Sequence, residues 1–495
     1  MPPLTARPRA PEAGLVAVLL FAVLSGCAAT PPSAPASFLA PCRLPDVPGL
    51  ALCGVLPRPE DPARPEGRSI PLRVVLLPAD HEPAAADPLV FLAGGPGQAA
   101  TEVIAAVLPS LAEVRRHRAL LFVDQRGTGS SNGLSCPPAV DPTLQEKLSL
   151  DAGLEELDAC LAALPADPRF YTTDLAMDDL DAVREALGIG QISLYGGSYG
   201  TRAGLVYLRR HGEHVRAAIL DGLAPPQVVL FATFGLDGSV ALARTFADCA
   251  AEPACAVAHP DVRARADALF ARLAATPAQT TLRDPRTGLP QPVRFERDLV
   301  ASLVRGSLYL PAMASLLPHA FARAEAGDWQ PLLGQGVVFA DSAADSIDIG
   351  MMLSVACAED LPRLTDAHRA AAAADPLLGT SLLDLMVATC ARWPAAPLPA
   401  GAGEPVVSDV PVLLLSGELD PVTPPHWADL AATTLSRSVH VVVPGTGHIA
   451  AGAGCVPDLL DEFLQAGTEQ GLDLDRDCLR PTRPPFFVSA AGPPP

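Results

Sequence analysis

The sequence predicts an α/β fold, with a mostly parallel, doubly wound sheet and an inserted, mainly helical cap. Through residues 70–223, short apolar segments bounded by Pro, Gly or Asp alternate with helical segments, which is typical of a parallel sheet covered by helices on both faces. The alternation stops between 224 and 403, where helical periodicity dominates, and it returns from 404. The 495 residues, 49% of them hydrophobic, are enough to bury a large core.

The individual elements follow in chain order. Strands are expected at 70–77, 88–92, 119–123, 191–195 and 215–220, and helices at 173–187 and 201–210. The first of these helices has Thr173 as its expected N-cap and Gly188 as its stop. In the cap, helices are expected at 239–247, 261–274 and 298–317, and strands at 412–416 and 438–443 complete the sheet.

Composition changes mark the ends of larger sections. The expected division is a signal peptide at 1–27, a Pro- and Ser-rich tether at 28–41, a first core section at 42–223, the helical cap at 224–403, a second core section at 404–480 and a proline-rich tail at 481–495. The core is therefore expected to be assembled from two separated stretches of the chain.

The N-terminus is typical of an export signal. Arg7 and Arg9 precede an apolar run at 14–24, which is too short to span a bilayer, because a spanning helix needs about 20 residues. The following Leu-Ser-Gly-Cys resembles a bacterial lipobox, in which Cys27 becomes the lipidated first residue; an ordinary signal peptide cleaved nearby is the alternative. Ala28 in place of Asp favours an outer-membrane anchor. We therefore expect a bacterial cell-envelope protein, on the periplasmic side or the surface, that touches the membrane only through its lipid.

The cysteine count agrees with export. Setting Cys27 aside leaves ten cysteines, and an even number in an exported chain favours disulfides. Because the cysteines fall into neighbouring couples, the expected pairs are Cys42–Cys53, Cys136–Cys160, Cys249–Cys255, Cys357–Cys390 and Cys455–Cys478.

Charge and composition exclude several classes of protein. A formal net charge of −20 leaves no basic face for nucleic acid. Lys147 is the single lysine, which disfavours pyridoxal phosphate enzymes and P-loop enzymes. No C-x-x-C pair occurs, so a zinc or redox site has little support. The sequence predicts no metal and no organic cofactor, and it leaves the oligomeric state open.

The stretch Gly-Gly-Ser-Tyr-Gly at 196–200 fits the G-x-S-x-G pattern of a nucleophile elbow and directly follows a predicted strand. Such a turn leaves one serine, here Ser198, on a strained backbone with its hydroxyl pointing away from the sheet. Gly196 and Gly200 lack the Cβ atoms that would collide in so tight a turn. Alone, the pattern is equally typical of a glycine-rich turn with an incidental serine, so the interpretation depends on the rest of the chain.

Two later strand ends carry the partners that a catalytic serine needs. Asp420 follows the strand at 412–416 and His448 follows the strand at 438–443, and the order Ser, Asp, His is that of an α/β-hydrolase. The imidazole would take the serine proton, and the carboxylate would fix its tautomer and stabilise the cation. The alternatives are Glu418 or Asp429 as the acid and His426 or His440 as the base.

An acyl-transfer site also needs backbone donors for the developing oxyanion. The amide of Tyr199, directly after the nucleophile, is one expected donor. The other is expected from the Gly-Gly-Pro-Gly stretch at 94–97. Pro96 has no N–H to give, so Gly95 is the first choice and Gly94 the second.

Six motifs extend from Gly94 to His448: A-G-G-P-G, D-Q-R-G-T-G, Y-T-T followed by D-L-D-A-V-R, G-G-S-Y-G, G-E-L-D-P-V-T-P and G-T-G-H. Together they resemble the proline iminopeptidase and tripeptidyl aminopeptidase (TAP-like) group of α/β-hydrolases. The resemblance implies a serine exopeptidase that releases residues or short peptides from peptide N-termini, with a helical cap over the site. Many relatives have a histidine where this chain has Ala93, a departure that leaves the triad intact.

An aminopeptidase must hold the ammonium group of a short peptide substrate, so the cap is expected to offer carboxylates. A cap segment without basic residues contains Asp341, Asp345, Asp348, Glu359 and Asp360. Glu359 and Asp360 are the expected ligands, because the disulfide at Cys357 would hold them in place; solvated surface is the alternative. Two other functions stay open: an esterase or lipase on the same scaffold, and a catalytically silent envelope lipoprotein that binds peptides.

Overall fold

The structure, a computed structural model, describes residues 38–136, 143–148, 154, 156–164, 166–375, 377–466, 472–481 and 483–488, without the side chains of 338–345. Cys27 and the expected signal and tether up to residue 37 lie outside the described residues. Within these ranges, no helix combines the length and the apolar character that crossing a membrane requires.

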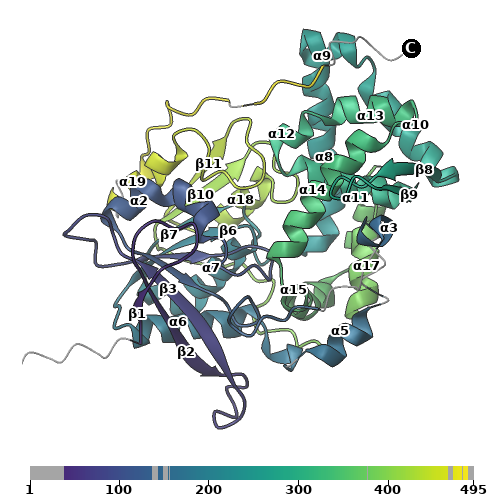
Figure 1. The fold of residues 1–495 in the computed structure, drawn as a ribbon. Coiled ribbons are helices and arrows are strands. Elements are labelled where there is room, and N and C mark those ends of the chain that lie inside the picture. The colour runs from purple at the N-terminus through teal and green to yellow at the C-terminus, as the bar shows by residue number, and fades with distance from the viewer. Residues whose placement is uncertain are drawn as a thin grey trace, which may run out of the picture. The chain divides into compact units, whose positions relative to one another are not determined.

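A nine-stranded sheet forms the centre of the fold, in the order β1-β2-β3-β5-β4-β6-β7-β10-β11 (Figure 1). The pairs from β1 to β5 are antiparallel and all pairs from β5 to β11 are parallel. This arrangement confirms the mostly parallel sheet expected from the sequence. The strands are β1 (Ala40–Cys42), β2 (Ala51–Pro59), β3 (Ser69–Leu77), β4 (Leu89–Leu92), β5 (Leu120–Val123), β6 (Ile192–Gly197), β7 (Val215–Asp221), β10 (Val412–Gly417) and β11 (Ser438–Val443).

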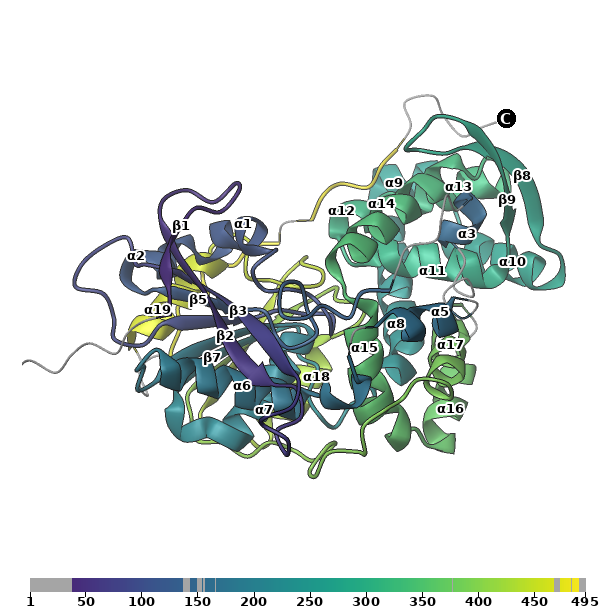
Figure 2. The same ribbon diagram turned by 60° about the horizontal axis from the view of Figure 1, so that its bottom comes forward.

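Alternating apolar residues give the sheet a core on each face, because successive strand residues point to opposite sides. In β3, Val74 belongs to the core under α6 (Thr173–Ala186), α7 (Tyr199–His211) and α18 (Pro425–Ala432). Its neighbour Val75 belongs to the opposite core, under α1 (Ile104–Val107), α2 (Ala112–His117) and α19 (Val456–Ala466). The sheet is therefore doubly wound, as Figures 1 and 2 show.

Between β7 and β10 the chain forms a mainly helical region (Figure 2). This region has its own hydrophobic core, which includes Leu242, Phe246, Phe270 and Phe321. Its helices are α8 (Leu230–Ala251), α9 (Pro253–Ala258), α10 (Val262–Ala275), α11 (Arg297–Leu308), α12 (Pro311–Ala314), α13 (Leu317–Glu325), α14 (Gln330–Ser346), α15 (Ile349–Val355), α16 (Asp366–Ala373) and α17 (Ser381–Cys390). A hairpin of β8 (Ala278–Arg283) and β9 (Pro290–Phe295) lies beside them. The short helix α3 (Leu144–Leu148) precedes this region in sequence, yet it packs its leucines into the same core.

Two expected helices differ in detail. The N-cap of α6 is Thr172, whose hydroxyl accepts a hydrogen bond from the amide of Leu175 at 3.4 Å, so Thr173 is already the first helical residue. The expected helix at 298–317 is interrupted after Leu308, and Pro311 begins a new one. A proline cannot continue a helix from its interior, because it lacks the donor N–H.

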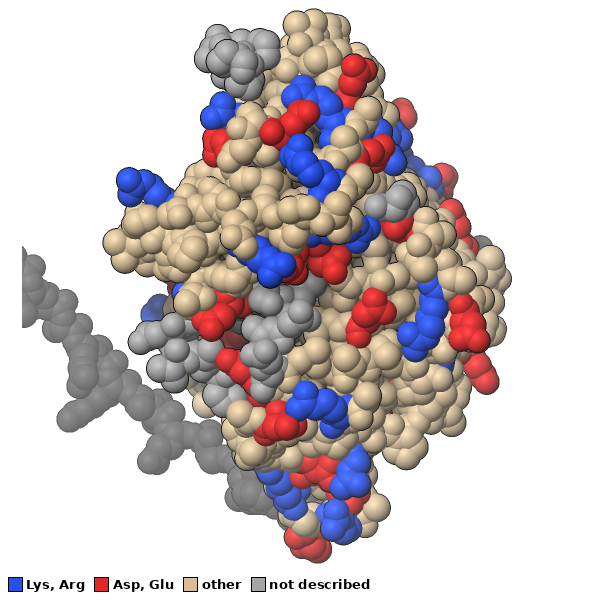
Figure 3. Space-filling model, turned by 90° about the vertical axis from the view of Figure 1, so that its right-hand side faces the viewer, with Lys and Arg blue, Asp and Glu red and all other residues tan. Residues whose placement is uncertain are grey.

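Five disulfides join the described cysteines, in the same pairs that the sequence suggested: Cys42–Cys53, Cys136–Cys160, Cys249–Cys255, Cys357–Cys390 and Cys455–Cys478. The Cys357–Cys390 bond ties the turn Ala356–Asp360 to the end of α17. On the face drawn in Figure 3, acidic and basic side chains are interspersed rather than gathered into a patch of one sign.

Candidate active site

Ser198 occupies the turn between β6 and α7. Its φ of 56° and ψ of −123° lie in a region that non-glycine residues rarely adopt, which is the strain expected of a nucleophile elbow. A Cβ at Gly196 would lie 2.3 Å from the carbonyl oxygen of Gly200, and a Cβ at Gly200 would lie 2.1 Å from that of Leu92. Both positions therefore require glycine, and Ser198 lines a cavity of about 480 Å³.

Asp420 and His448 form a direct pair, with Nδ1 of the imidazole 2.8 Å from Oδ2 of the carboxylate. Burial alone would raise the pKa of Asp420, but the neighbouring His448 and the hydrogen bonds to the carboxylate outweigh it and lower that pKa. Burial likewise opposes protonation of His448, but Asp420 and, more weakly, Asp221 raise its pKa above the usual value. The carboxylate therefore stays ionised and stabilises the imidazolium that a general base becomes.

Thr423, which was not predicted from the sequence, contacts both members of this pair. Its hydroxyl lies 2.7 Å from Oδ2 of Asp420 and 3.1 Å from Nδ1 of His448. Its amide donates to Oδ1 of Asp420 at 2.8 Å, and the amide of Val422 does so at 3.0 Å. The aspartate thus caps its own turn, a local pattern that Asp followed by Pro-Val-Thr could have indicated.

His448 lines the same cavity as Ser198. Among the described residues, no hydrogen bond joins the Ser198 hydroxyl to the imidazole; such bonds are often long in unliganded enzymes and tighten when substrate binds. The amide of His448 donates to the carbonyl oxygen of Tyr309 at 3.1 Å, and the two rings meet edge to face at 5.2 Å between centroids. The helical region therefore contacts His448 directly and supplies part of the cavity wall.

The alternative acids and bases lie elsewhere. Glu418 pairs with Arg244 at 3.0 Å and accepts from the amide of Gly445. Asp429 binds Nδ1 of His440 at 2.8 Å, and His426 faces Asp237. Because none of these four lines the cavity around Ser198, the geometry favours Asp420 and His448 as its partners.

Of the expected oxyanion donors, the two glycines lie at the same cavity. Gly94 and Gly95 line it, and Tyr199 begins α7, where the first amides have no partner within the helix. The amide of Gly94 already donates to Oε1 of Gln98 at 3.3 Å, whereas the amide of Gly95 has no hydrogen-bond acceptor among the described residues. This contrast favours Gly95 over Gly94 as the second donor.

Asp221, at the end of β7, was not predicted from the sequence. It hydrogen-bonds both to Ser198 and to the loop that follows His448. Its carbonyl oxygen accepts from the amide of Ser198 at 2.9 Å. Its buried carboxylate accepts from Tyr195 Oη and from the amides of Ala450 and Ala451 at 2.8–2.9 Å, two and three residues after His448.

Glu359 and Asp360 do not line this cavity. Glu359 accepts from the amide and hydroxyl of Thr173 at 2.7 and 2.8 Å, and Thr173 in turn contacts Tyr199 Oη. Asp360 is buried against Arg202, at 2.9 Å. Their carboxylates are thus engaged inside the protein, because the turn at Ala356–Asp360 directs them toward α6 and α7 rather than toward the cavity.

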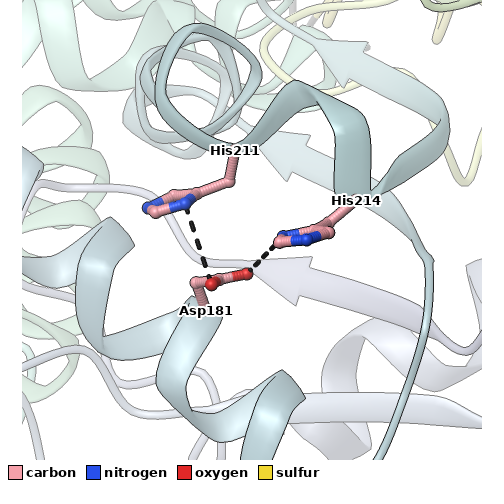
Figure 4. Close-up of side chains that lie close together, drawn as sticks. All are labelled: Asp181, His211 and His214. Atoms are coloured by element: carbon pink, nitrogen blue, oxygen red, sulfur yellow. Dashed lines mark hydrogen bonds and ion pairs between the residues drawn. The ribbon is translucent and has the colours of Figure 1, made fainter.

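No cluster of metal-ligating side chains lies at the cavity in the described part of the chain. Such a cluster does occur at the far end of α7, where Asp181, His211 and His214 approach one another (Figure 4). The groups that line the cavity include a serine hydroxyl, an imidazole and backbone amides, and the carboxylate of Asp420 is bonded to that imidazole.

The chain matches two protein-family profiles, one described as alpha/beta hydrolase fold over residues 87–256 and one described as TAP-like protein over residues 375–478. It is 26% identical over 470 residues to "Serine protease Hip1" of Mycobacterium tuberculosis, covering 86% of this chain and 88% of the relative. It is 25% identical over 460 residues to "Tripeptidyl aminopeptidase" of Streptomyces lividans, covering 85% and 83%. A third relative, "Carboxylesterase B" of M. tuberculosis, is 29% identical over 470 residues, covering 84% and 85%.

Proposed function

We propose that this chain, which is an α/β-hydrolase of the TAP-like serine peptidase family, is an exported aminopeptidase that releases residues or short peptides from peptide N-termini. The observation that carries the proposal is the Asp420–His448 pair, whose imidazole lines the same cavity as Ser198. His448 takes the proton of Ser198 as it attacks the peptide carbonyl, and then gives that proton to the leaving amine. Water, activated by the same imidazole, then hydrolyses the acyl-enzyme.

The cavity walls favour an apolar residue on the acyl side of the cleaved bond. Phe91, Tyr195, Tyr309, Ile347 and Ile449 line the cavity together with Ser198. Burial raises the pKa of Tyr309 to about 12, so its ring is neutral at working pH. No arginine or lysine contributes to the walls within the described residues, which leaves an acidic side chain on the substrate without a partner.

A second cavity of about 450 Å³ supports binding of the substrate's ammonium group. It shares Ser346 and Ile347 with the catalytic cavity and is also lined by Glu102 and Asp348. In the described part of the chain neither acid forms an ion pair with a basic side chain; Asp348 accepts from the amide of Gly129 at 2.7 Å and from the hydroxyl of Ser135. Two carboxylates with no basic partner attract a cation. We assign the ammonium group to this cavity, with Glu102 as its exposed ligand.

The test of the catalytic assignment is the Ser198→Ala variant of the purified, full chain. Hydrolysis of unblocked mono-, di- and tripeptide chromogenic substrates is expected to fall to background, and labelling by a fluorophosphonate probe is expected to disappear. Retained turnover by the folded variant would refute the role of Ser198.

The test of the ammonium site is Glu102→Gln, with Glu404→Gln as the matched control, because Glu404 is exposed and lines neither cavity. We expect KM for unblocked peptides to rise roughly tenfold in Glu102→Gln, while kcat stays near the wild-type value. Turnover of a small ester that carries no ammonium group is expected to be unchanged, which separates this assignment from that of Ser198. An unchanged KM would place the ammonium group elsewhere.

An esterase is the second candidate, because one relative is named carboxylesterase and the cavity is mainly apolar. Blocking the substrate's N-terminus distinguishes the two functions. An aminopeptidase that uses an acidic anchor loses most of its kcat/KM on acetylated peptides, whereas an esterase is indifferent.

Export and lipidation at Cys27 belong to the same proposal, supported by the signal-like N-terminus and by five disulfides in the described chain. The expected location is the bacterial outer membrane. Cys27→Ser is expected to abolish incorporation of a labelled fatty acid and to release the protein from the membrane fraction. Incorporation that persists in the variant would contradict lipidation at this residue.

A further inference from the structure

Three potential metal ligands meet at the end of α7, away from the catalytic cavity. Asp181 lies on α6, His211 is the last residue of α7, and His214 ends the short 3₁₀ turn Gly212–His214 that leads into β7. Figure 4 shows both imidazole rings beside the carboxylate of Asp181. All three side chains are partly exposed, with 17–30% of each side chain accessible, so an ion could reach them from solvent.

The distances fit one small ion. Nδ1 of His214 lies 2.9 Å from Oδ1 of Asp181, Nδ1 of His211 lies 3.7 Å from Oδ2, and the ligand atoms all lie within 4.8 Å of one another. Tetrahedral zinc, with bonds of about 2.0–2.1 Å, places its ligand atoms roughly 3.3 Å apart. Only small side-chain rotations are therefore needed to bring the most widely separated ligand atoms to this spacing.

A second carboxylate orients His211 for this role. Nε2 of His211 lies 2.9 Å from Oδ1 of Asp178, so in the neutral ring Nε2 carries the proton and donates it to that oxygen. In that neutral ring, Nδ1 carries a lone pair and lies 3.7 Å from Oδ2 of Asp181. A carboxylate that fixes the tautomer of a ligating histidine in this way is the usual arrangement behind a metal-bound imidazole.

The surrounding charges select the class of metal. Arg184 binds Asp181 at 2.6 Å and Arg210 binds Asp178 at 2.6 Å, so the two carboxylates are largely neutralised. The hydroxyl of Tyr207 also donates to Oδ1 of Asp181, at 2.8 Å. Calcium and magnesium, which depend on several negative oxygens, are disfavoured here, whereas zinc, nickel and copper bind imidazole well.

We propose that Asp181, His211 and His214 bind a divalent transition-metal ion, zinc by ligand preference, with water in the open fourth position. The ion would tie α6 to the end of α7 and to the turn before β7. Since α7 has 13 residues, a rise of about 1.5 Å per residue puts the site roughly 20 Å from Ser198, at the other end of the helix. Its role is structural, so hydrolysis by Ser198 does not require it.

The experiment is a titration of the chelator-treated full chain with Zn²⁺ by calorimetry and with Co²⁺ by visible absorption. We expect one equivalent to bind with micromolar or tighter affinity, and the Co²⁺ bands to have the intensity of tetrahedral coordination. His214→Ala and His211→Ala are each expected to weaken binding at least tenfold, and the double variant to abolish it. His440→Ala is the control, because His440 contacts Asp429 and Ser416 but no third ligand.

A thermal unfolding series keeps the proposal testable where a variant is unstable. Zn²⁺ is expected to raise the Tm of the wild-type chain and of His440→Ala, but not that of the double variant. The proposal is overturned if the chelator-treated wild type binds no Zn²⁺, or if the double variant binds it as tightly as the wild type does.

Discussion

Ser198 and Asp221 are joined through the backbone, with the Ser198 amide 2.9 Å from the carbonyl oxygen of Asp221. The carboxylate of the same aspartate accepts from the amides of Ala450 and Ala451, two and three residues after His448. One buried residue at the end of β7 thus fixes both the turn that carries Ser198 and the loop that carries His448. The distance between these two groups is therefore set by Asp221 as well as by the sheet.

Replacing Asp221 with Asn is expected to lower kcat. The amide of Ala450 donates to both carboxylate oxygens at 2.9 Å, so the new NH2 group would face this donor at either position. A buried donor without an acceptor costs about 1–3 kcal/mol. We expect the loop that carries His448 to shift in order to relieve part of this free-energy cost. This displacement is expected to lower kcat roughly tenfold to a hundredfold. Steady-state kinetics with an unblocked peptide measures this loss of kcat.

The control for Asp221→Asn is Asp87→Asn. Asp87 is also buried in the core, but its partners are Ser193, Arg118 and Arg216, away from the cavity. This variant is expected to lose stability while its folded fraction keeps the wild-type kcat. Equal losses of kcat in both variants would show that Asp221 acts only on general stability.

Thr423→Val is expected to reduce kcat with little change in KM. The substitution keeps the side-chain shape but removes the hydroxyl that lies 2.7 Å from Asp420 and 3.1 Å from His448. A hydrogen bond to a charged group contributes about 1.5–3 kcal/mol, so kcat is expected to fall roughly tenfold or more. Thr423→Ser restores the hydroxyl and is expected to recover most of the rate; failure of this rescue would contradict a role for the hydrogen bond.

The acid limb of the pH–rate profile is expected above pH 6.5. Burial disfavours the imidazolium, but Asp420 and Asp221 outweigh it and raise the pKa of His448. Only the neutral imidazole can accept the serine proton, so kcat/KM rises as pH increases through this raised pKa. In Asp420→Asn the limb is expected at lower pH, together with a large loss of kcat. A wild-type limb below pH 6.5 would contradict the raised pKa.

The sequence predicted what glycines and strand ends determine. At Gly196 and Gly200 no other residue fits, so these two glycines indicate the nucleophile elbow from the sequence alone. Because parallel strands end at one edge of the sheet, Ser198, Asp420 and His448 were expected to come together there, and the structure places Ser198 and His448 at one cavity with Asp420 bonded to the histidine.

The sequence did not predict contacts that depend on the direction in which a side chain points. The acids at 359 and 360 looked available because no basic neighbour is close in sequence, yet the turn at Ala356–Asp360 points them at Thr173 and Arg202, more than 150 positions away in the chain. Asp221 was overlooked for the converse reason. Its partners at 450 and 451 become neighbours only when β7 and β10 pair in the sheet, since the loop after β11 then reaches the end of β7.

The Glu359→Gln variant tests whether Glu359 binds the substrate's ammonium group, as the sequence suggested, or acts only inside the protein, as its contacts indicate. The glutamine oxygen can still accept from the amide of Thr173, and its amide can donate to the Thr173 hydroxyl, so the fold is expected to survive. Because Glu359 does not line the catalytic cavity, KM for unblocked peptides is expected to equal that of the wild type. A rise in KM confined to unblocked substrates would restore Glu359 as the ammonium ligand.

The same variant is expected to change how stability depends on pH. Burial raises the pKa of Glu359 to about 7, from 4.5 when exposed, so between these values the folded protein holds a proton that the unfolded chain has lost. This group therefore makes the free energy of unfolding fall as pH increases from 4.5 to 7. The glutamine side chain of the variant cannot ionise, so the stability of the variant relative to the wild type is expected to increase across that window. Urea unfolding of both proteins at about pH 5 and about pH 8 measures the difference, and a constant difference would show that Glu359 is not a buried carboxyl with a raised pKa.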